Sequence, residues 1–207
     1  MKYNNMKLYI LRHEDRTMDA TFFSPLTKEG LDNSIKLIDL LKKEDITKLY
    51  SSPFIRTLQT IYPYSKTIDK KINVDYSLGE IQHPHIIPEK SYQITLPLYL
   101  SQSFNCNEKY TSIFNPIDYE YPEDEKKVEK RVRRFITKLI TDELKSNHHI
   151  VIITHQIVCN IILQIVNKYN KNIEIRSAFN YPKGGLTQVF DKDKWVFKPR
   201  NWEYQVN

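Results

Sequence analysis

The sequence predicts an α/β fold, a three-layer α/β/α sandwich around a mostly parallel central sheet. Two short, nearly continuous apolar runs, Lys7–His13 and His149–His155, are typical of strands that are covered on both faces. Strand-like and helix-like patterns alternate along most of the chain, as they do in sheets that lie between helices. With 207 residues and 40% hydrophobic side chains, residues 1–207 are expected to form a single domain with a sizeable core.

After the first apolar run, a helix is predicted at Thr27–Glu44, with Thr27 as its N-cap. The apolar stripe expected on its buried face consists of Leu31, Ile35, Ile38 and Leu41. A short strand is predicted at Lys48–Ser51. The next helix should begin with Ser52 as N-cap and Pro53 at the first helical position.

A third short strand is predicted at Ile72–Leu78, and a long helix at Pro122–Ser146. Acidic residues suit the dipole of this helix in its first turn, namely Glu123, Asp124 and Glu125. Its buried face is expected to consist of Val128, Val132, Phe135 and Leu139. The second apolar run is followed by a predicted helix, Ile157–Lys168, and the hairpin Leu186–Phe190 with Trp195–Lys198 should close the sheet.

Residues 81–121 interrupt the alternation with a long segment that is rich in proline and aromatic residues. Its prolines include Pro84, Pro88, Pro97 and Pro116. A loop of this length in a compact domain is usually functional, so one interpretation is a lid that selects the substrate. The alternative is an irregular packed excursion, and length alone does not separate the two.

The formal net charge of +6 favours an anionic partner, either a phosphorylated substrate or nucleic acid, although a solvated basic surface gives the same charge. On the long helix, basic side chains are interleaved with acids, and no nucleic-acid-binding motif accompanies them. A solvated face is therefore favoured over a nucleic-acid interface. These basic residues are Lys126, Lys127, Lys130, Arg131, Arg134 and Lys138.

Cys106 and Cys159 form neither a disulfide framework nor a zinc pattern. His83 and His85 have no further ligands near them in the sequence, so we expect no metal site and no cofactor. No apolar run is long enough to span a bilayer, and the short polar stretch before the first strand is not expected to act as a secretory signal. We therefore expect a soluble cytoplasmic protein without a membrane partner.

Polar side chains gather at the carboxyl ends of the predicted strands, which is where open α/β sheets bind ligands. Histidines end the two apolar runs, one glutamate follows the third strand, and three arginines lie beside a strand end or in the first turn of a helix. In chain order, these residues are Arg12, His13, Arg16, Arg56, Glu80 and His155.

This set of side chains suits phosphoryl chemistry. Arginine forks match the oxygens of a phosphoryl dianion, and three arginines can neutralise its charge without a metal. A neutral imidazole can attack phosphorus, and a carboxyl group can protonate the leaving oxygen and then deprotonate the attacking water.

The motifs around these residues resemble the histidine phosphatase superfamily, which has the phosphoglycerate-mutase-like fold. They appear in the family's order as Leu11-Arg12-His13, Ser51-Ser52-Pro53-Phe54-Ile55-Arg56-Thr57-Leu58-Gln59-Thr60, Leu78-Gly79-Glu80 and Thr154-His155. The spacing Arg12-His13-x-x-Arg16-x-x-Asp19 is similar to that of the phosphatase domains of ubiquitin-associated/SH3 proteins.

The resemblance implies metal-independent hydrolysis of phosphomonoesters, with catalytic roles for His13, Glu80 and His155. His13 would be the nucleophile that becomes phosphohistidine, and Glu80 would be the general acid and base. The groups that hold the phosphoryl oxygens would be Arg12, Arg16, Arg56 and His155. The mutases of the superfamily carry a small hydroxyl residue at the position of Arg16, so Arg16 favours hydrolysis over a mutase reaction.

Two residues depart from the family pattern, since Glu14 and Gln156 follow the histidines where the family usually has a small residue. A binding module with weakened catalysis is therefore an alternative function, and a phosphoglycerate-mutase-type phosphotransferase is another. The substrate is either a small phosphomonoester or a phosphotyrosine-like one. The oligomeric state is left open, with a homodimer as one alternative.

Overall fold

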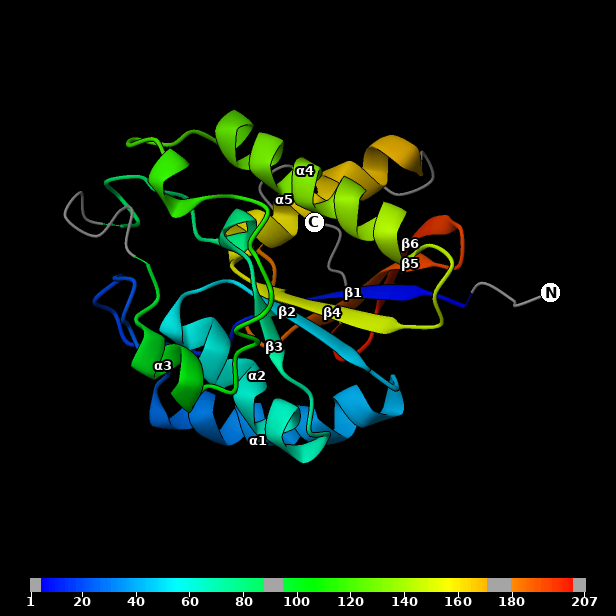
Figure 1. Ribbon diagram of the computed structural model, residues 1–207, viewed down its shortest axis with the longest axis horizontal. Coiled ribbons are helices and arrows are strands. Elements are labelled where there is room, and N and C mark those ends of the chain that lie inside the picture. Colours follow the sequence, from blue (N-terminus) through cyan, green and yellow to red (C-terminus); the bar gives the residue numbers. More distant parts are fainter. Residues whose placement is uncertain (1–4, 88–94, 171–179, 203–207) are drawn as a thin grey trace.

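The computed structural model describes residues 5–87, 95–170 and 180–202, and these contain one six-stranded sheet flanked by helices (Figure 1). The strands are β1 Lys7–Arg12, β2 Lys48–Ser51, β3 Ile72–Val74, β4 His149–Thr154, β5 Leu186–Asp191 and β6 Lys194–Pro199. The helices are α1 Lys28–Lys43, α2 Ile55–Thr67, α3 Leu98–Ser103, α4 Glu125–Glu143 and α5 Gln156–Tyr169, with 3-10 turns η1 Tyr76–Leu78 and η3 Pro116–Asp118.

The sheet has the strand order β3-β2-β4-β1-β5-β6. The first four strands in this order run parallel, whereas β5 is antiparallel to β1, and β6 is antiparallel to β5. The predicted fold class, including the closing hairpin, is therefore confirmed. The parallel register pairs Arg12 with Thr154, so the residues that follow these two strands emerge side by side.

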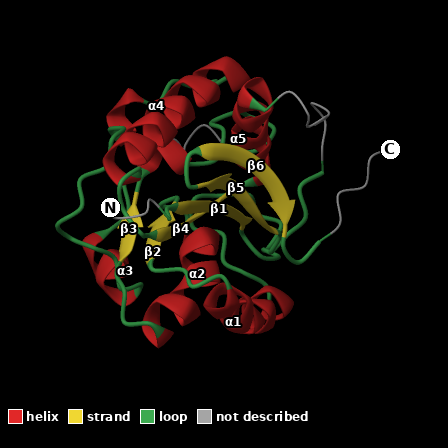
Figure 2. Ribbon diagram, turned by 90° about the vertical axis from the view of Figure 1, so that its right-hand side faces the viewer, coloured by secondary structure: helices red, strands yellow, loops and turns green. Residues whose placement is uncertain are grey.

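Helices α4 and α5 cover one face of the sheet, and α1 and α2 cover the other (Figures 1 and 2). Along β1, Leu8 and Ile10 pack into the core beneath α4 and α5, while Tyr9 and Leu11 pack into the core above α1 and α2. Because both faces of the strand are covered, apolar side chains are needed on both of them. The strand sequence is therefore a continuous apolar run and does not alternate between apolar and polar residues.

The stripe predicted for α1 is wrong in part. Thr27 does cap the helix, accepting a hydrogen bond from the backbone N–H of Gly30, but Leu31 and Ile35 are 41% and 59% exposed. The face that packs inward consists of Gly30, Ser34, Leu37 and Leu41. Its first residue explains the difference, because a Cβ at Gly30 would overlap the backbone carbonyl oxygen of Asp15. Only a face with small residues can approach the chain so closely.

The start of α2 also differs from the prediction. The helix begins at Ile55, its N-cap is Phe54, and no side chain caps it. Ser52 and Pro53 precede it, and the Ser52 hydroxyl bonds to His155 instead. Arg56 still lies in the first turn of the helix, as expected.

Two other boundaries are shorter than predicted. Strand β3 ends at Val74, and the chain then turns through η1 before Glu80. Helix α4 begins at Glu125 with Asp124 as its N-cap, so Glu123 lies outside the helix. The predicted buried face of α4 is confirmed, since Val128, Val132, Phe135 and Leu139 are all buried.

Residues 81–87 and 95–121 combine short helical turns with irregular chain. Ile87 packs against Phe22 and Phe54 in a small cluster of its own, which fits a packed excursion over at least that part. Pro88 lies outside the described residues, and the role of a lid stays a prediction. None of the helices in residues 5–87, 95–170 and 180–202 has both the length and the apolar character needed to cross a membrane.

Candidate active site

The neighbouring strands β1 and β4 bring His13 and His155 together at their carboxyl ends. The backbone N–H of His13 donates to the carbonyl of Thr154 at 3.0 Å, and the two imidazole centroids are 5.3 Å apart. Both rings are buried, with exposures of 3% and 0%. The two histidines that the sequence placed at a common sheet edge are therefore in contact.

The hydrogen bonding of His13 leaves one ring nitrogen available. Its Nδ1 lies 2.7 Å from the carbonyl oxygen of Glu14, which accepts only, so Nδ1 must carry the proton and Nε2 keeps its lone pair. Burial, followed by the charge of Arg56, lowers the pKa of His13 well below its ordinary value. The ring is therefore neutral at physiological pH, as a nucleophile must be.

Each of the three arginines is anchored by a backbone carbonyl. Arg56 Nη1 donates to the carbonyl of Thr21 at 2.9 Å, and Arg12 Nη1 donates to that of Tyr181. Arg16 Nη1 donates to the carbonyl of its neighbour in the chain at 2.6 Å. The charges of all three lower the pKa of His13, so all three act on the same small region.

Glu80 lies between Arg56 and the second histidine. Its Oε2 is 3.8 Å from Arg56 Nη2 and 3.5 Å from His155 Nδ1, and its Oε1 accepts a 3.1 Å hydrogen bond from the N–H of Ile81. Burial raises the pKa of Glu80, and the Arg56 charge opposes that rise. A raised pKa favours a protonated carboxyl group, which can donate a proton.

His155 is held through its other nitrogen by Ser52, whose Oγ lies 2.8 Å from Nε2. Ser52 Oγ also accepts a 3.4 Å hydrogen bond from the N–H of Phe54, so its hydroxyl proton is free to be donated to the imidazole. Nδ1 then carries the remaining proton and is a donor. Burial, followed by Arg56, lowers the pKa of His155 well below its ordinary value.

Three buried donors of this cluster have no hydrogen-bond partner in the described part of the chain: Arg12 Nε, Arg56 Nε and His155 Nδ1. A buried polar group without a partner costs about 1–3 kcal/mol, and charged groups cost more. An anion that accepts hydrogen bonds from these donors would remove that cost. The arrangement is therefore suited to a compact, multiply charged oxyanion.

Glu14, one of the two departures from the family pattern, contacts α1 and the turn at Gly184 with its side chain. Its side chain accepts a hydrogen bond from Asn33 and its carboxylate packs directly against Gly184, where an added Cβ would overlap it. Gly184 has a φ of +63° and donates its N–H to the carbonyl of Arg12 at 3.1 Å. The charge of Glu14 is thus directed toward α1 and this turn. Gln156 is the first residue of α5 and is partly exposed.

A role in the site was not predicted from the sequence for three residues that support it: Ser52, Thr60 and Tyr181. Thr60 Oγ1 accepts a 3.0 Å hydrogen bond from the N–H of Glu14, which fixes the chain next to His13. Ser52 and Thr60 belong to the motif around Arg56, so a signal for them was present. The carbonyl of Tyr181 is a backbone group of a distant segment, and no sequence signal could have found it.

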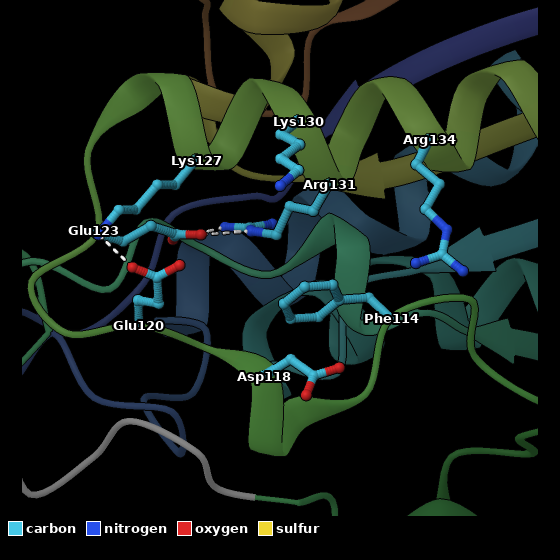
Figure 3. Close-up of a pocket in the computed structure, with 8 residues that line it drawn as sticks. All are labelled: Phe114, Asp118, Glu120, Glu123, Lys127, Lys130, Arg131 and Arg134. Carbon is cyan, nitrogen blue, oxygen red and sulfur yellow. Dashed lines mark hydrogen bonds and ion pairs between the residues drawn. The ribbon is translucent and has the colours of Figure 1, made fainter.

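One residue of the predicted solvated face of α4 is not on the surface. Arg131 is only 3% exposed, because it pairs with Glu123 beside a cavity of about 500 Å³ (Figure 3). Among residues 5–87, 95–170 and 180–202, no three His, Cys, Asp or Glu side chains gather in a way that could hold a metal ion.

The fold and the site together define an α/β protein with a buried, histidine-centred and arginine-rich cluster at the carboxyl ends of β1 and β4. The model of the "Histidine phosphatase superfamily (branch 1)" matches residues 8–203. The chain therefore belongs to this superfamily. No curated protein matches the sequence.

Solved structures with the same fold are distant in sequence. An ecdysone phosphate phosphatase from Bombix mori, in complex with tungstate, has a TM-score of 0.71 and 14% identity, over 98% of this chain and 95% of that chain. A mycobacterial glucosyl-3-phosphoglycerate phosphatase in complex with VO3 has a TM-score of 0.65 and 15% identity, over 95% and 99%. A mutant phosphoserine phosphatase from Entamoeba histolytica, in complex with phosphoserine, has a TM-score of 0.59 and 15% identity, over 95% and 97%.

Proposed function

We propose that the protein is a phosphatase that hydrolyses phosphomonoesters without a metal, through a phosphohistidine on His13. The observation that carries the proposal is the convergence of buried donors, which have no partner among the described residues, around a neutral imidazole whose Nε2 keeps its lone pair. Membership of the superfamily supports the same reaction class. Three of the solved structures with this fold are named as phosphatases.

In the first step, Nε2 of His13 attacks phosphorus and forms a P–N bond while the bond from phosphorus to the leaving oxygen breaks. Glu80, whose pKa burial raises, gives its proton to that oxygen. The developing charge on the phosphoryl oxygens is balanced by Arg12, Arg16 and Arg56, with His155 Nδ1–H as a further donor.

In the second step, water attacks the phosphohistidine. Glu80, now ionised, accepts a proton from the water as the new P–O bond forms and the P–N bond breaks. Inorganic phosphate leaves, His13 returns to its neutral form and Glu80 is protonated again. The protein needs no further co-reactant for the cycle.

For the substrate, we propose a phosphotyrosine-like aryl phosphate or a small metabolite phosphate. The first choice rests on the spacing of Arg12, Arg16 and Asp19, which resembles the phosphatase domains of ubiquitin-associated/SH3 proteins. The side chains around Ile87, Phe22 and Phe54 come from residues 81–121 and from the chain next to the site, and we propose that they contribute to selection. A cytoplasmic location, a single domain and the oligomeric state stay predictions.

A binding module with weakened catalysis is less well supported, because the Glu14 carboxylate bonds to Asn33. The decisive experiment is rapid acid-free quenching after mixing with radiolabelled p-nitrophenyl phosphate. Label should be trapped on the wild-type chain and not on His13→Ala, which should also lose turnover. A His13→Ala protein that hydrolyses the substrate at the wild-type rate would exclude this mechanism.

A further inference from the structure

Arg131 and Glu123 form an ion pair in the interior, between α4 and the turn that leads to Glu80. Arg131 Nε and Nη2 donate to the two carboxylate oxygens of Glu123 at 2.7 and 2.9 Å, and both side chains are almost fully buried (Figure 3). A buried ion pair is often no more stable than well-packed apolar residues of the same volume. A contribution to stability is therefore a weak explanation for the presence of this ion pair. The other hydrogen bonds of Arg131 and Glu123 indicate what else the pair does.

Those contacts all involve the backbone around Glu80. Arg131 Nη1 donates to the carbonyl of Ser77 at 2.6 Å, and its Nη2 is 3.4 Å from the carbonyl oxygen of Glu80. Glu123 accepts from the N–H of Gln82 at 3.0 Å and donates its own N–H to the carbonyl of Gln82 at 2.6 Å. The pair thus holds the chain both before and after Glu80.

Two more side chains, those of Gln82 and Tyr119, hold the same stretch of backbone. Gln82 Nε2 donates to the carbonyl of Glu80 at 2.8 Å. Tyr119 donates its hydroxyl to the carbonyl of Tyr76, and its ring centroid lies 5.3 Å from the Arg131 guanidinium. The same hydroxyl occupies the space where a Cβ at Gly79 would lie, so the turn before Glu80 is packed against a fixed surface.

The Glu80 side chain, by contrast, is weakly held at its functional end. In the described part of the chain, its only hydrogen bond is to the N–H of its neighbour Ile81, and its Oε2 stands 3.5 Å and 3.8 Å from His155 and Arg56. The position of the carboxyl group therefore depends on the backbone that carries it. A displacement of about 1 Å in a reacting group can reduce a rate about 10²-fold.

We propose that Arg131 and Glu123 are positioning residues that fix the backbone of Glu80 so that its carboxyl group reaches the leaving oxygen. This inference rests on the proposed function, because Glu80 must act as the general acid. Gln82 belongs to the same device. Loss of the pair should therefore impair proton donation more than the attack by His13.

The experiment compares Glu123→Gln with wild type on p-nitrophenyl phosphate, whose leaving group needs little protonation, and on phenyl phosphate, whose leaving group needs more. Glu80→Gln provides the reference for lost acid catalysis, which contributes about 10²- to 10⁴-fold. Glu123→Gln should lower kcat/KM, which reports the step that releases the leaving group, about tenfold more on phenyl phosphate than on p-nitrophenyl phosphate. In the double variant with Glu80→Gln, that selective loss should disappear.

Glu143→Gln is the matched control, because it makes the same change in a buried carboxylate at the end of α4, where the ion-pair partners in the described part of the chain are Lys48 and His148. It should leave the ratio of the two kcat/KM values unchanged. Gln82→Met is a second variant, which removes one hydrogen-bond donor to the carbonyl of Glu80 without changing the buried charges. It should also reduce activity on phenyl phosphate more than activity on p-nitrophenyl phosphate.

Equal losses on both substrates for Glu123→Gln and Gln82→Met would overturn the inference while leaving the proposed function intact. If Glu123→Gln does not fold, Gln82→Met decides alone. A wild-type protein without turnover, or a Glu80→Gln variant without any leaving-group selectivity, would overturn the proposed function and the inference with it.

Discussion

Replacing Arg56 with methionine should reduce phosphatase activity strongly and shift its pH dependence upward. Arg56 is 1% exposed, Nη1 is occupied by the carbonyl of Thr21, and Nε has no partner within the described ranges. Nε and Nη2 can therefore donate two hydrogen bonds to a phosphoryl group. Hydrogen bonds to charged groups contribute about 1.5–3 kcal/mol each, so the loss is about 3–6 kcal/mol, or about 10²- to 10⁴-fold in kcat/KM.

The direction of the pH shift follows from the charge of Arg56. Apart from burial, this charge is the largest cause that lowers the pKa of His13, and it also lowers the pKa of Glu80. Without it both pKa values rise. The acid limb of the profile, which reports neutral His13, and the alkaline limb, which reports protonated Glu80, should both move to higher pH.

The assay is kcat/KM on p-nitrophenyl phosphate across the pH range for wild type, Arg56→Met and Arg133→Met. Arg133 is the control because it pairs with Glu129 on α4, where both side chains are partly exposed. Thermal unfolding shows whether the variants keep the fold. A folded Arg56→Met protein with an unchanged profile, or with limbs moved to lower pH, would refute the assignment of Arg56 to the site.

Three further predictions test other parts of the molecule. Glu80→Gln should slow phenyl phosphate about 10²-fold or more but p-nitrophenyl phosphate much less, and equal losses in steady-state kinetics would contradict its role as the acid. Ser52→Ala leaves Nε2 of buried His155 without its partner, so kcat should fall about tenfold. The free energy of unfolding in urea should also fall, by about 1–3 kcal/mol. Unchanged kinetics would show that the serine does not orient the imidazole. Gly30→Ala should lower the free energy of unfolding by about 1–3 kcal/mol, because its Cβ overlaps the carbonyl of Asp15. Leu31 is exposed, so Leu31→Ala should change this free energy little. Equal effects of the two substitutions would reject the explanation given for the buried face of α1.

The fold class and the residues of the candidate site could both be predicted from the amino-acid sequence. Both depend on local signals: continuous apolar runs that end in His13 and His155, a capped helix at Thr27, and motifs around Arg56 and Glu80. Strands that are buried on both faces consist almost entirely of apolar residues. Polar residues at the ends of such strands are therefore easy to recognise in the sequence. The structure accordingly places the six predicted residues in one region.

The buried faces of the helices and the pairing of distant side chains became known from the three-dimensional structure alone. Leu31 and Ile35 have the spacing of one helix face, yet both are exposed. The face that contains Gly30 is buried instead, because the backbone of Asp15 approaches the helix there. Arg131 stands among solvated basic residues in the sequence, but it bonds to the carbonyl of Ser77, 54 residues earlier in the chain. Periodicity is a property of neighbours in the sequence, whereas burial and hydrogen bonding depend on partners that folding brings from far away.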